Sequence, residues 1–198
     1  LILRDLAQGT SKILVEGASL LKPAWIQGVI VQAWAPDSEH IYYLQSDAGM
    51  SQLNKVNVIS GDREELDMTP YTSLGQPAVN LNGRIVLLAN APTISSRVIS
   101  IKDQQVSIHQ RSTSEAIPPE DLPSPYEINW KTSDGETVYG IYSPPTSSRY
   151  DGRGLPPAIV LIHGGPTSRV SIGYNLEAAF FTSRGYGYLE VNYRGSTG

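Results

Sequence analysis

Residues 157–166, which read PAIVLIHGGP, join a short apolar run to two glycines and a proline. The run is rich in β-branched residues, a pattern typical of a buried strand. Gly164 and Gly165 permit a sharp turn and leave their backbone N–H groups uncovered by side chains, and Pro166 fixes φ in the loop that follows. Such a loop could aim a peptide N–H at a developing negative charge. A plain strand-to-helix turn is the alternative that this motif alone leaves open.

The residues after this motif indicate a helix and then a second strand. Apolar residues near helical spacing predict a helix at 174–184, and residues 187–192 return to a strand pattern. We therefore predict that 157–163 and 187–192 are neighbouring parallel strands connected by this helix. We also expect the N–H groups of Gly164 and Gly165 to stay outside the sheet ladder, with at least one facing a cleft.

Composition excludes several classes of protein. The chain has 198 residues, a net charge of −4 and no run rich in Lys or Arg, so we expect neither nucleic acid nor a membrane as partner. It has no cysteine, which excludes disulfides and cysteine catalysis. The three histidines, His40, His109 and His163, are far apart in the sequence, and we expect no metal and no cofactor. His40 and His109 are interpreted as ordinary surface or interblade residues without an acidic or serine partner nearby in sequence.

The predicted location is cytoplasmic. No stretch approaches the roughly 20 apolar residues that a membrane-spanning helix needs. The N-terminal residues LILRDLAQGT contain neither an initiator Met nor a signal-peptide pattern. We expect both ends of the sequence to fall inside domains.

The first 121 residues carry an internal repeat. The stretches 1–17, 52–68 and 96–112 each combine an alternating strand, a polar turn and a second strand, and they recur about every 45–50 residues. Other paired strands lie between them, one pair joined by the hairpin dipeptide Asn82-Gly83. Four short strands per period are typical of β-propeller blades. A β-sandwich would explain the strands but not the repeat. We predict a partial propeller of roughly three blades over residues 1–121.

The character of the sequence changes after a proline-rich stretch. Residues 116–125, AIPPEDLPSP, are predicted to form a stiff linker. A hairpin, a buried strand, a helix and another strand follow, which indicates a mixed sheet covered by helices. The predicted fold class is therefore mixed β and α/β, with the second domain spanning residues 122–198.

Four segments carry a resemblance to a known family. They are WAPD at 34–37, WKTSDGETVYGIYSPP at 130–145, LIHGGP at 161–166 and NYRGSTG at 192–198. In this order they resemble the prolyl oligopeptidase family of serine peptidases, especially its acylaminoacyl-peptidase and dipeptidyl-peptidase-like branch. The resemblance implies a β-propeller followed by the N-terminal part of an α/β-hydrolase domain. From its place beside a turn of the repeat, Trp34 is itself interpreted as a structural residue packed between blades. It also implies hydrolysis of short peptides through an acyl-enzyme. Acylaminoacyl, dipeptidyl and endo-oligopeptidase specificities all stay open.

The resemblance also assigns roles to particular residues. It places His163, Gly164 and Gly165 in the oxyanion-hole loop. Gly165 would donate its backbone N–H to the tetrahedral intermediate. His163 would shape the loop, because the catalytic base of an α/β-hydrolase follows the nucleophile in the chain. Arg194 would contact substrate or pair with a carboxylate, and a buried structural salt bridge is the alternative that we favour for it.

The sequence departs from the family in one respect. It contains no Gly-x-Ser-x-Gly nucleophile motif, and Ser196 lacks the strand–turn–helix context of a nucleophile. We therefore expect the Ser/Asp/His triad to lie outside these residues and the chain by itself to be inactive and poorly stable. The remainder of the same polypeptide, or a second copy, is the expected protein partner. A non-enzymatic propeller binding module, similar to the periplasmic Tol-system propeller, and an α/β-hydrolase esterase are the alternatives; residues 126–198 argue against the first.

Overall fold

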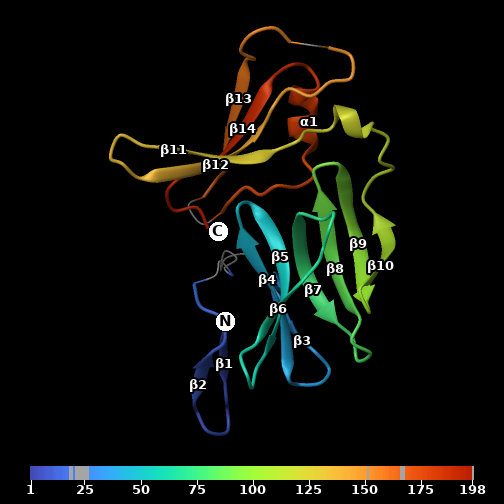
Figure 1. Cartoon of the computed structure of the whole chain (residues 1–198), viewed down its shortest axis with the longest axis vertical. Helices are drawn as coiled ribbons and strands as arrows, with labels where there is room; N and C mark the ends of the chain where they lie inside the picture. The colour runs from blue at the N-terminus through green and yellow to red at the C-terminus, as the bar shows by residue number, and fades with distance from the viewer. Residues whose placement is uncertain (18–19, 21–26, 151, 166–167, 198) are drawn as a thin grey trace.

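The computed structural model describes residues 1–17, 20, 27–150, 152–165 and 168–197. Its strands form two groups that lie end to end (Figure 1). The first group is entirely antiparallel and comprises one hairpin and two four-stranded sheets. The second group is a mixed four-stranded sheet packed against a helix. The predicted fold class, a partial propeller followed by an α/β portion, is confirmed.

The antiparallel group consists of consecutive strands. The hairpin has β1 (Ile2–Arg4) and β2 (Ser11–Ile13). The first four-stranded sheet has β3 (Gln32–Trp34), β4 (His40–Asp47), β5 (Met50–Asn57) and β6 (Arg63–Leu66), in that order. The second has β7 (Ser73–Val79), β8 (Ile85–Ala91), β9 (Ile94–Lys102) and β10 (Gln105–Arg111). The hairpins predicted from the repeat are β1–β2, β5–β6 and β9–β10, so the repeat corresponds to blade-like units.

Side chains that accept backbone hydrogen bonds close the turns within these sheets. Asn80 accepts from the N–H groups of Asn82 and Arg84, both at 3.0 Å, which closes the predicted Asn82-Gly83 hairpin. Asp37 likewise accepts from Glu39 N at 2.8 Å and His40 N at 3.0 Å. Because short polar side chains favour such turns, the sequence was sufficient to place them.

Two expectations about this group, for His40 and for Trp34, are wrong. His40 does have an acidic partner, because its Nδ1 lies 2.8 Å from an Asp37 oxygen. His109 contacts a serine that is nine positions away in the sequence, with Nε2 2.8 Å from Ser100 Oγ. Trp34 is 50% exposed rather than packed between blades, because it lies on the short edge strand β3. Asp37 is only three positions from His40 and was overlooked in the sequence, whereas the pairing of β9 with β10 brings Ser100 to His109.

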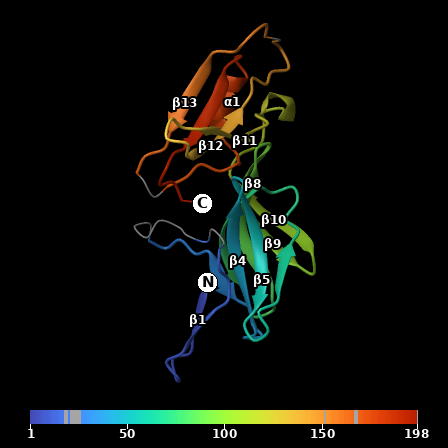
Figure 2. The ribbon, with the colours of Figure 1, turned by 60° about the vertical axis from the view of Figure 1, so that its left-hand side comes forward.

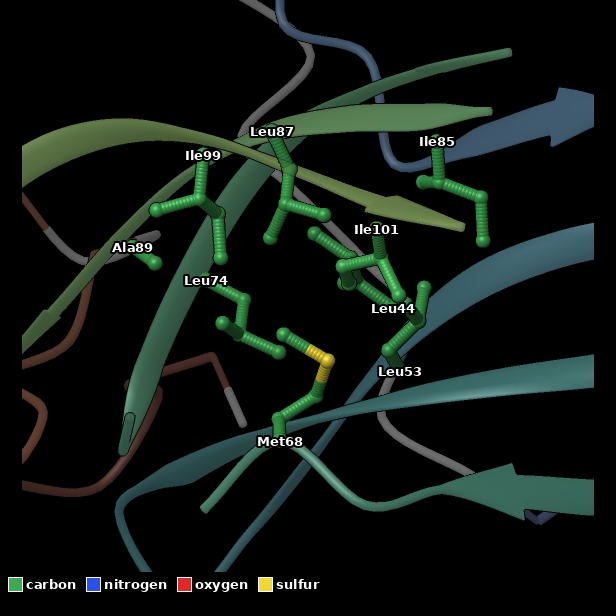
Figure 3. Packing of buried hydrophobic residues seen from close by; sticks show 9 residues of the cluster. All are labelled: Leu44, Leu53, Met68, Leu74, Ile85, Leu87, Ala89, Ile99 and Ile101. Carbon is green, nitrogen blue, oxygen red and sulfur yellow. The ribbon is translucent and has the colours of Figure 1, made fainter. Parts of the chain in front are cut away.

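The main hydrophobic core lies between the two four-stranded sheets. Alternating burial along β4, β5, β8 and β9 turns one side of each strand toward it, as the two-residue period of a strand requires. Figure 3 shows these side chains converging from both sheets, with Met68 beside Leu74. The buried members are Leu44, Leu53, Met68, Leu74, Ile85, Leu87, Ala89, Ile99 and Ile101.

The stretch 116–125 connects the two groups and contains a short 3-10 turn, η1 (Pro119–Asp121). Proline at the start of this turn suits its fixed φ. The division of the chain into domains at residues 121 and 122 stays a prediction.

The mixed sheet contains β11 (Tyr126–Lys131), β12 (Thr137–Ser143), β13 (Ala158–Ile162) and β14 (Gly187–Asn192), in the order β11-β12-β14-β13. The strands β13 and β14 are parallel, which confirms the prediction for 157–163 and 187–192. The helix α1 (Leu176–Thr182) lies within the predicted 174–184 and packs against β14. Figure 2 shows this sheet beyond the ends of β4 and β8. Among the described residues, no helix is long and apolar enough to cross a membrane.

Candidate active site

The candidate site lies where β13 and β14 end. Because these strands are parallel, their carboxyl ends share one edge of the sheet, which is where open α/β sheets place their ligands. Residues 163–165 follow β13, and residues 192–197 include the end of β14 and the loop after it. Two motifs of the sequence analysis are therefore neighbours in space.

Side chains of the second loop contact the first directly. The ring of His163 stacks on that of Tyr193, with centroids 4.5 Å apart and an interplanar angle of 22°. His163 Nε2 lies 2.8 Å from Ser196 Oγ. The Tyr193 hydroxyl donates to the carbonyl of Gly165 at 2.7 Å. The same hydroxyl lies 3.3 Å from the carbonyl oxygen of His163. Stacking and the hydrogen bonds of Tyr193 and Ser196 thus hold the loops together.

The hydrogen-bond pattern indicates which atoms of this network donate and which accept. Ser196 Oγ donates its one proton to the carbonyl of Tyr193 at 2.6 Å, so its oxygen is left to accept from His163 Nε2–H. Among the described residues, no carboxylate lies within ion-pair distance of His163. The pair therefore lacks the acid that orients the base of a catalytic triad. Its geometry is that of a structural hydrogen bond between two loops.

Both predicted oxyanion-hole glycines are exposed, and Gly165 has a φ of 68°. That left-handed conformation favours glycine. A Cβ at Gly164 or Gly165 would meet no heavy atom within 4 Å, so one side of the loop is open. Within the described part of the chain, neither N–H has a hydrogen-bond acceptor, as predicted. That one of them faces a cleft stays a prediction.

Arg194 pairs with a carboxylate on the β11–β12 turn. Its Nη1 lies 2.7 Å from an Asp134 oxygen, and both side chains are well exposed. A hydrogen bond from Thr132 and the Arg194 guanidinium hold the pKa of Asp134 below its usual value. The expectation of a buried salt bridge is wrong in this respect, because both partners lie in loops that solvent reaches. A substrate contact by Arg194 stays a prediction.

A hollow of about 470 Å³ lies beside the 192–197 loop, and none of residues 163–165 lines it. One wall is the tip of the β4–β5 hairpin, residues 46–49, and the opposite wall is residues 192–197. Arg169 also lines it and donates to the Ser46 hydroxyl, and burial lowers the pKa of its guanidinium. The hollow thus lies between a propeller hairpin and the carboxyl edge of the mixed sheet.

Other features of the described residues are less suited to chemistry. A hollow of about 510 Å³ lies against α1 and the linker and contains none of the residues of the loops 163–165 and 192–197. No three His, Cys, Asp or Glu side chains gather there or elsewhere in the described ranges into a set that could hold a metal ion. We therefore place the candidate site at the loops.

The sequence analysis identified His163, Gly164, Gly165 and Arg194, and the structure brings the first three together with Tyr193 and Ser196. It missed the partner of His163. The signal was present, because Ser196 follows the strand predicted to lie beside that of His163. Which hydroxyl would face the ring depends on the path of the second loop, and no periodic pattern encodes that path.

Comparisons with known proteins agree with this fold. No protein-family model matches the chain. It is 48% identical over 54 residues to "Dipeptidyl peptidase family member 6" of Caenorhabditis elegans, which covers 25% of this chain and 7% of that protein. It is 37% identical over 78 residues to "Dipeptidyl aminopeptidase BIII" of Pseudoxanthomonas mexicana, covering 37% and 11%. The "Acylamino-acid-releasing enzyme 1" of Oryza sativa subsp. japonica is 50% identical over 42 residues, covering 21% and 5%.

Solved structures match nearly the whole chain. The crystal structure of a puromycin hydrolase superimposes with a TM-score of 0.89 and 29% identity, covering 98% of this chain and 30% of the other. A puromycin-hydrolysing peptidase of Mycobacterium tuberculosis gives a TM-score of 0.86 at 27% identity, covering 96% and 30%. A prolyl endopeptidase, at 11% identity and a TM-score of 0.73, shares the fold over 98% of this chain and 28% of its own. The chain therefore spans less than a third of the length of these proteins.

Proposed function

Because this chain is related in sequence and fold to peptidases of the prolyl oligopeptidase family, we propose that it supplies the oxyanion-hole loop and part of the propeller of a serine peptidase. Its substrates are short peptides. The observation that carries the proposal is the pair of exposed glycine N–H groups in the loop 163–165, without acceptors among the described residues. That loop is hydrogen-bonded to the 192–197 loop at the carboxyl edge of the sheet.

In the proposed reaction, a serine outside these 198 residues attacks the carbonyl carbon of the scissile peptide bond, and its hydroxyl proton passes to the catalytic base. The carbonyl oxygen gains the electron pair of the opening double bond and becomes an oxyanion. The N–H of Gly165, with Gly164 beside it, donates to that oxygen. Collapse of the intermediate expels the amine, which takes a proton from the catalytic base, and water then hydrolyses the acyl-enzyme. A single donor of this kind stabilises the transition state by about 3–4 kcal/mol.

His163 and Ser196 have a supporting role in this proposal. The Ser196 proton is already donated to a backbone carbonyl, and His163 has no carboxylate partner in the described part of the chain. Both facts favour a role in holding the loop over a role as nucleophile and base. Tyr193 adds to this support by fixing the carbonyl of Gly165.

The hollow beside the 192–197 loop is the proposed place for the peptide. Its volume of about 470 Å³ suits a small ligand, and Arg194 in its lining is the proposed substrate contact. The relatives named above act as dipeptidyl peptidase, acylamino-acid-releasing enzyme and puromycin hydrolase, so a substrate panel should contain all three kinds of compound. A cytoplasmic location, and assembly with the rest of the polypeptide or with a second copy, complete the proposal.

The proposal is tested with the full-length polypeptide that contains this sequence. We expect it to cleave acylated or free-amine peptide nitroanilides, or puromycin, and we expect residues 1–198 alone to be inactive. The variant Ser196→Ala should retain activity within about tenfold, whereas loss of a nucleophile costs about 10⁶-fold in kcat. Complete loss of activity in Ser196→Ala, with the fold intact by circular dichroism, would show that Ser196 is the nucleophile. No turnover of any substrate by the full-length protein would contradict the peptidase proposal.

A further inference from the structure

Residues 168–174, here called the crossing segment, run from the first loop of the site to α1 and pass along the ends of the propeller strands (Figure 1). The segment contains no helix or strand. Its backbone is nevertheless hydrogen-bonded at alternate residues, to the mixed sheet at Val170 and to the propeller sheets at Ile172 and Tyr174.

The propeller side of these contacts involves both four-stranded sheets. Ile172 N donates at 2.7 Å to the carbonyl of Gly49, at the β4–β5 turn. The Ile172 carbonyl accepts from the Thr72 hydroxyl, just before β7, at 2.9 Å. Tyr174 N donates at 2.8 Å to Asn90 Oδ1, on β8. The crossing segment is therefore fixed relative to two blades at once.

Close packing accompanies these hydrogen bonds. A Cβ added to Gly173 would lie 2.5 Å from Asn90 Oδ1 and 3.2 Å from Ser73 Cβ, so glycine is needed for the approach. Ile172 is buried, and its side chain lies next to Gly49. The Asn90 amide thus touches the crossing segment at two consecutive residues.

The other side of the segment is bonded to the candidate site. Val170 N donates to Asn192 Oδ1 at 2.8 Å, and Asn192 Nδ2 donates to the Val170 carbonyl at 3.2 Å. Thr197 N donates to the carbonyl of Ser168 at 3.0 Å. Both partners belong to the 192–197 loop, which holds the oxyanion-hole loop through Tyr193 and Ser196.

We propose that the propeller positions the oxyanion-hole loop through the crossing segment, and that Asn90 is a positioning residue for catalysis. The inference rests on the proposed function, because it assigns Asn90 an effect on the peptidase site. The physical reason is conformational entropy. A segment without helix or strand keeps one backbone conformation only while its hydrogen bonds offset the cost of ordering it. Losing the Asn90 acceptor frees Tyr174 N and loosens the segment, and with it the 192–197 loop.

The test uses the full-length protein and the variant Asn90→Ala. We expect kcat/KM to fall about fivefold, the factor that corresponds to one neutral hydrogen bond. Backbone hydrogen exchange should become faster in residues 168–174 and 192–197. Asn90→Asp retains a side-chain oxygen that accepts from Tyr174 N, and should restore kcat/KM.

Asn80→Ala is the matched control. It removes the side chain that closes the β7–β8 hairpin at its opposite end and touches no residue of the crossing segment. It should lower stability without the change in kcat/KM or in exchange at 192–197. Equal losses of kcat/KM in the two variants, or unchanged exchange at 192–197 in Asn90→Ala, would overturn the inference. Hydrogen exchange measures the coupling between Asn90 and the 192–197 loop whether or not the protein is a peptidase. Failure of the proposed function would instead appear as absence of turnover by the full-length protein.

Discussion

His163 and Ser196 are 33 positions apart in the sequence, yet His163 Nε2 lies 2.8 Å from Ser196 Oγ. The contact exists because β13 and β14 are parallel neighbours, so the loops after them leave the sheet at the same edge. Stacking of His163 on Tyr193 adds a second contact between the same loops. The two loops are therefore one structural unit, and a change in either should alter the other.

The first prediction concerns His163→Phe, which retains stacking on Tyr193 but removes the hydrogen bond to Ser196. In the full-length protein kcat should fall by less than about tenfold, since one neutral hydrogen bond is lost. The pH profile of kcat/KM should keep its shape, because the proposed mechanism assigns the catalytic base to a different residue. A loss of a thousandfold or more would instead identify His163 as that base.

His109→Phe is the control for this prediction. His109 Nε2 lies 2.8 Å from Ser100 Oγ, the same distance as in the site, but the pair lies on β9 and β10 of the propeller. Its replacement should leave kcat and KM unchanged. An equal loss of activity in both variants would point to general destabilisation of the protein.

Much of this fold could be predicted because local patterns determine it. Alternating strands and the Asn82-Gly83 dipeptide predict hairpins, and the order of strand, helix and strand around 157–192 predicts a parallel pair. The position of the glycines after β13 also predicts the candidate loop. These signals depend on chemistry within a few residues of one another, so a single sequence contains them.

The remaining features depend on how distant segments pack. The contact of Asn90 with Tyr174 spans 84 positions, and the pairing of Arg194 with Asp134 spans 60. No local period connects such residues. Arg194 was expected in a buried pair, but whether its loop faces the core or solvent is decided by the route of residues 193–197. The contacts that organise the site were therefore the ones that the sequence concealed.

The second prediction concerns the ion pair of Arg97 with Glu115. Arg97 is only 9% exposed, and Glu115 also accepts from the N–H of Ser95 at 3.1 Å and its hydroxyl at 2.8 Å. Glu115→Ala would leave a buried guanidinium without its partner, which costs about 3 kcal/mol of unfolding free energy. Urea unfolding of the full-length protein should show the loss as a lower midpoint.

The control for Glu115 is Glu64→Ala. Glu64 pairs with Lys55 at 2.6 Å, but its side chain is exposed. Pairs of this kind contribute little to stability because water screens them. A shift in the urea midpoint as large for Glu64→Ala as for Glu115→Ala would contradict the importance of burial.

The third prediction concerns pH. Glu190 lies on β14 with 9% exposure, and burial, with the nearby Glu177 charge, raises the pKa of its carboxyl. The folded protein therefore keeps this proton to a higher pH than the unfolded chain, whose glutamates titrate near a pH of about 4.3. The stability due to this difference is fully present below that pH and is lost as pH rises through the pKa of the folded state.

Glu190→Gln should remove this loss, since the amide has no charge to bury. At pH 7 the variant should unfold at a higher urea concentration than the parent protein, and the difference should shrink as the pH approaches 4. A difference that does not change with pH would show that ionisation of Glu190 is not its cause.

The last prediction concerns Gly140 on β12, which pairs with Val191 of β14. A Cβ at this position would lie 2.9 Å from the carbonyl oxygen of Glu190 and 3.2 Å from Trp130 Cζ3. A backbone oxygen cannot move aside as a side chain can, so Gly140→Ala should separate the two strands locally and cost about 1–3 kcal/mol of unfolding free energy.

Gly75→Ala on β7 is the matched control, because its Cβ would meet no atom within 4 Å. That variant should be neutral, or more stable by about 0.4–1 kcal/mol through the lower entropy of its unfolded chain. Urea unfolding of both variants measures the difference. If Gly140→Ala and Gly75→Ala unfold at the same urea midpoint, the β12–β14 contact tolerates a methyl group. The mixed sheet would then be less tightly paired at this point than its geometry indicates.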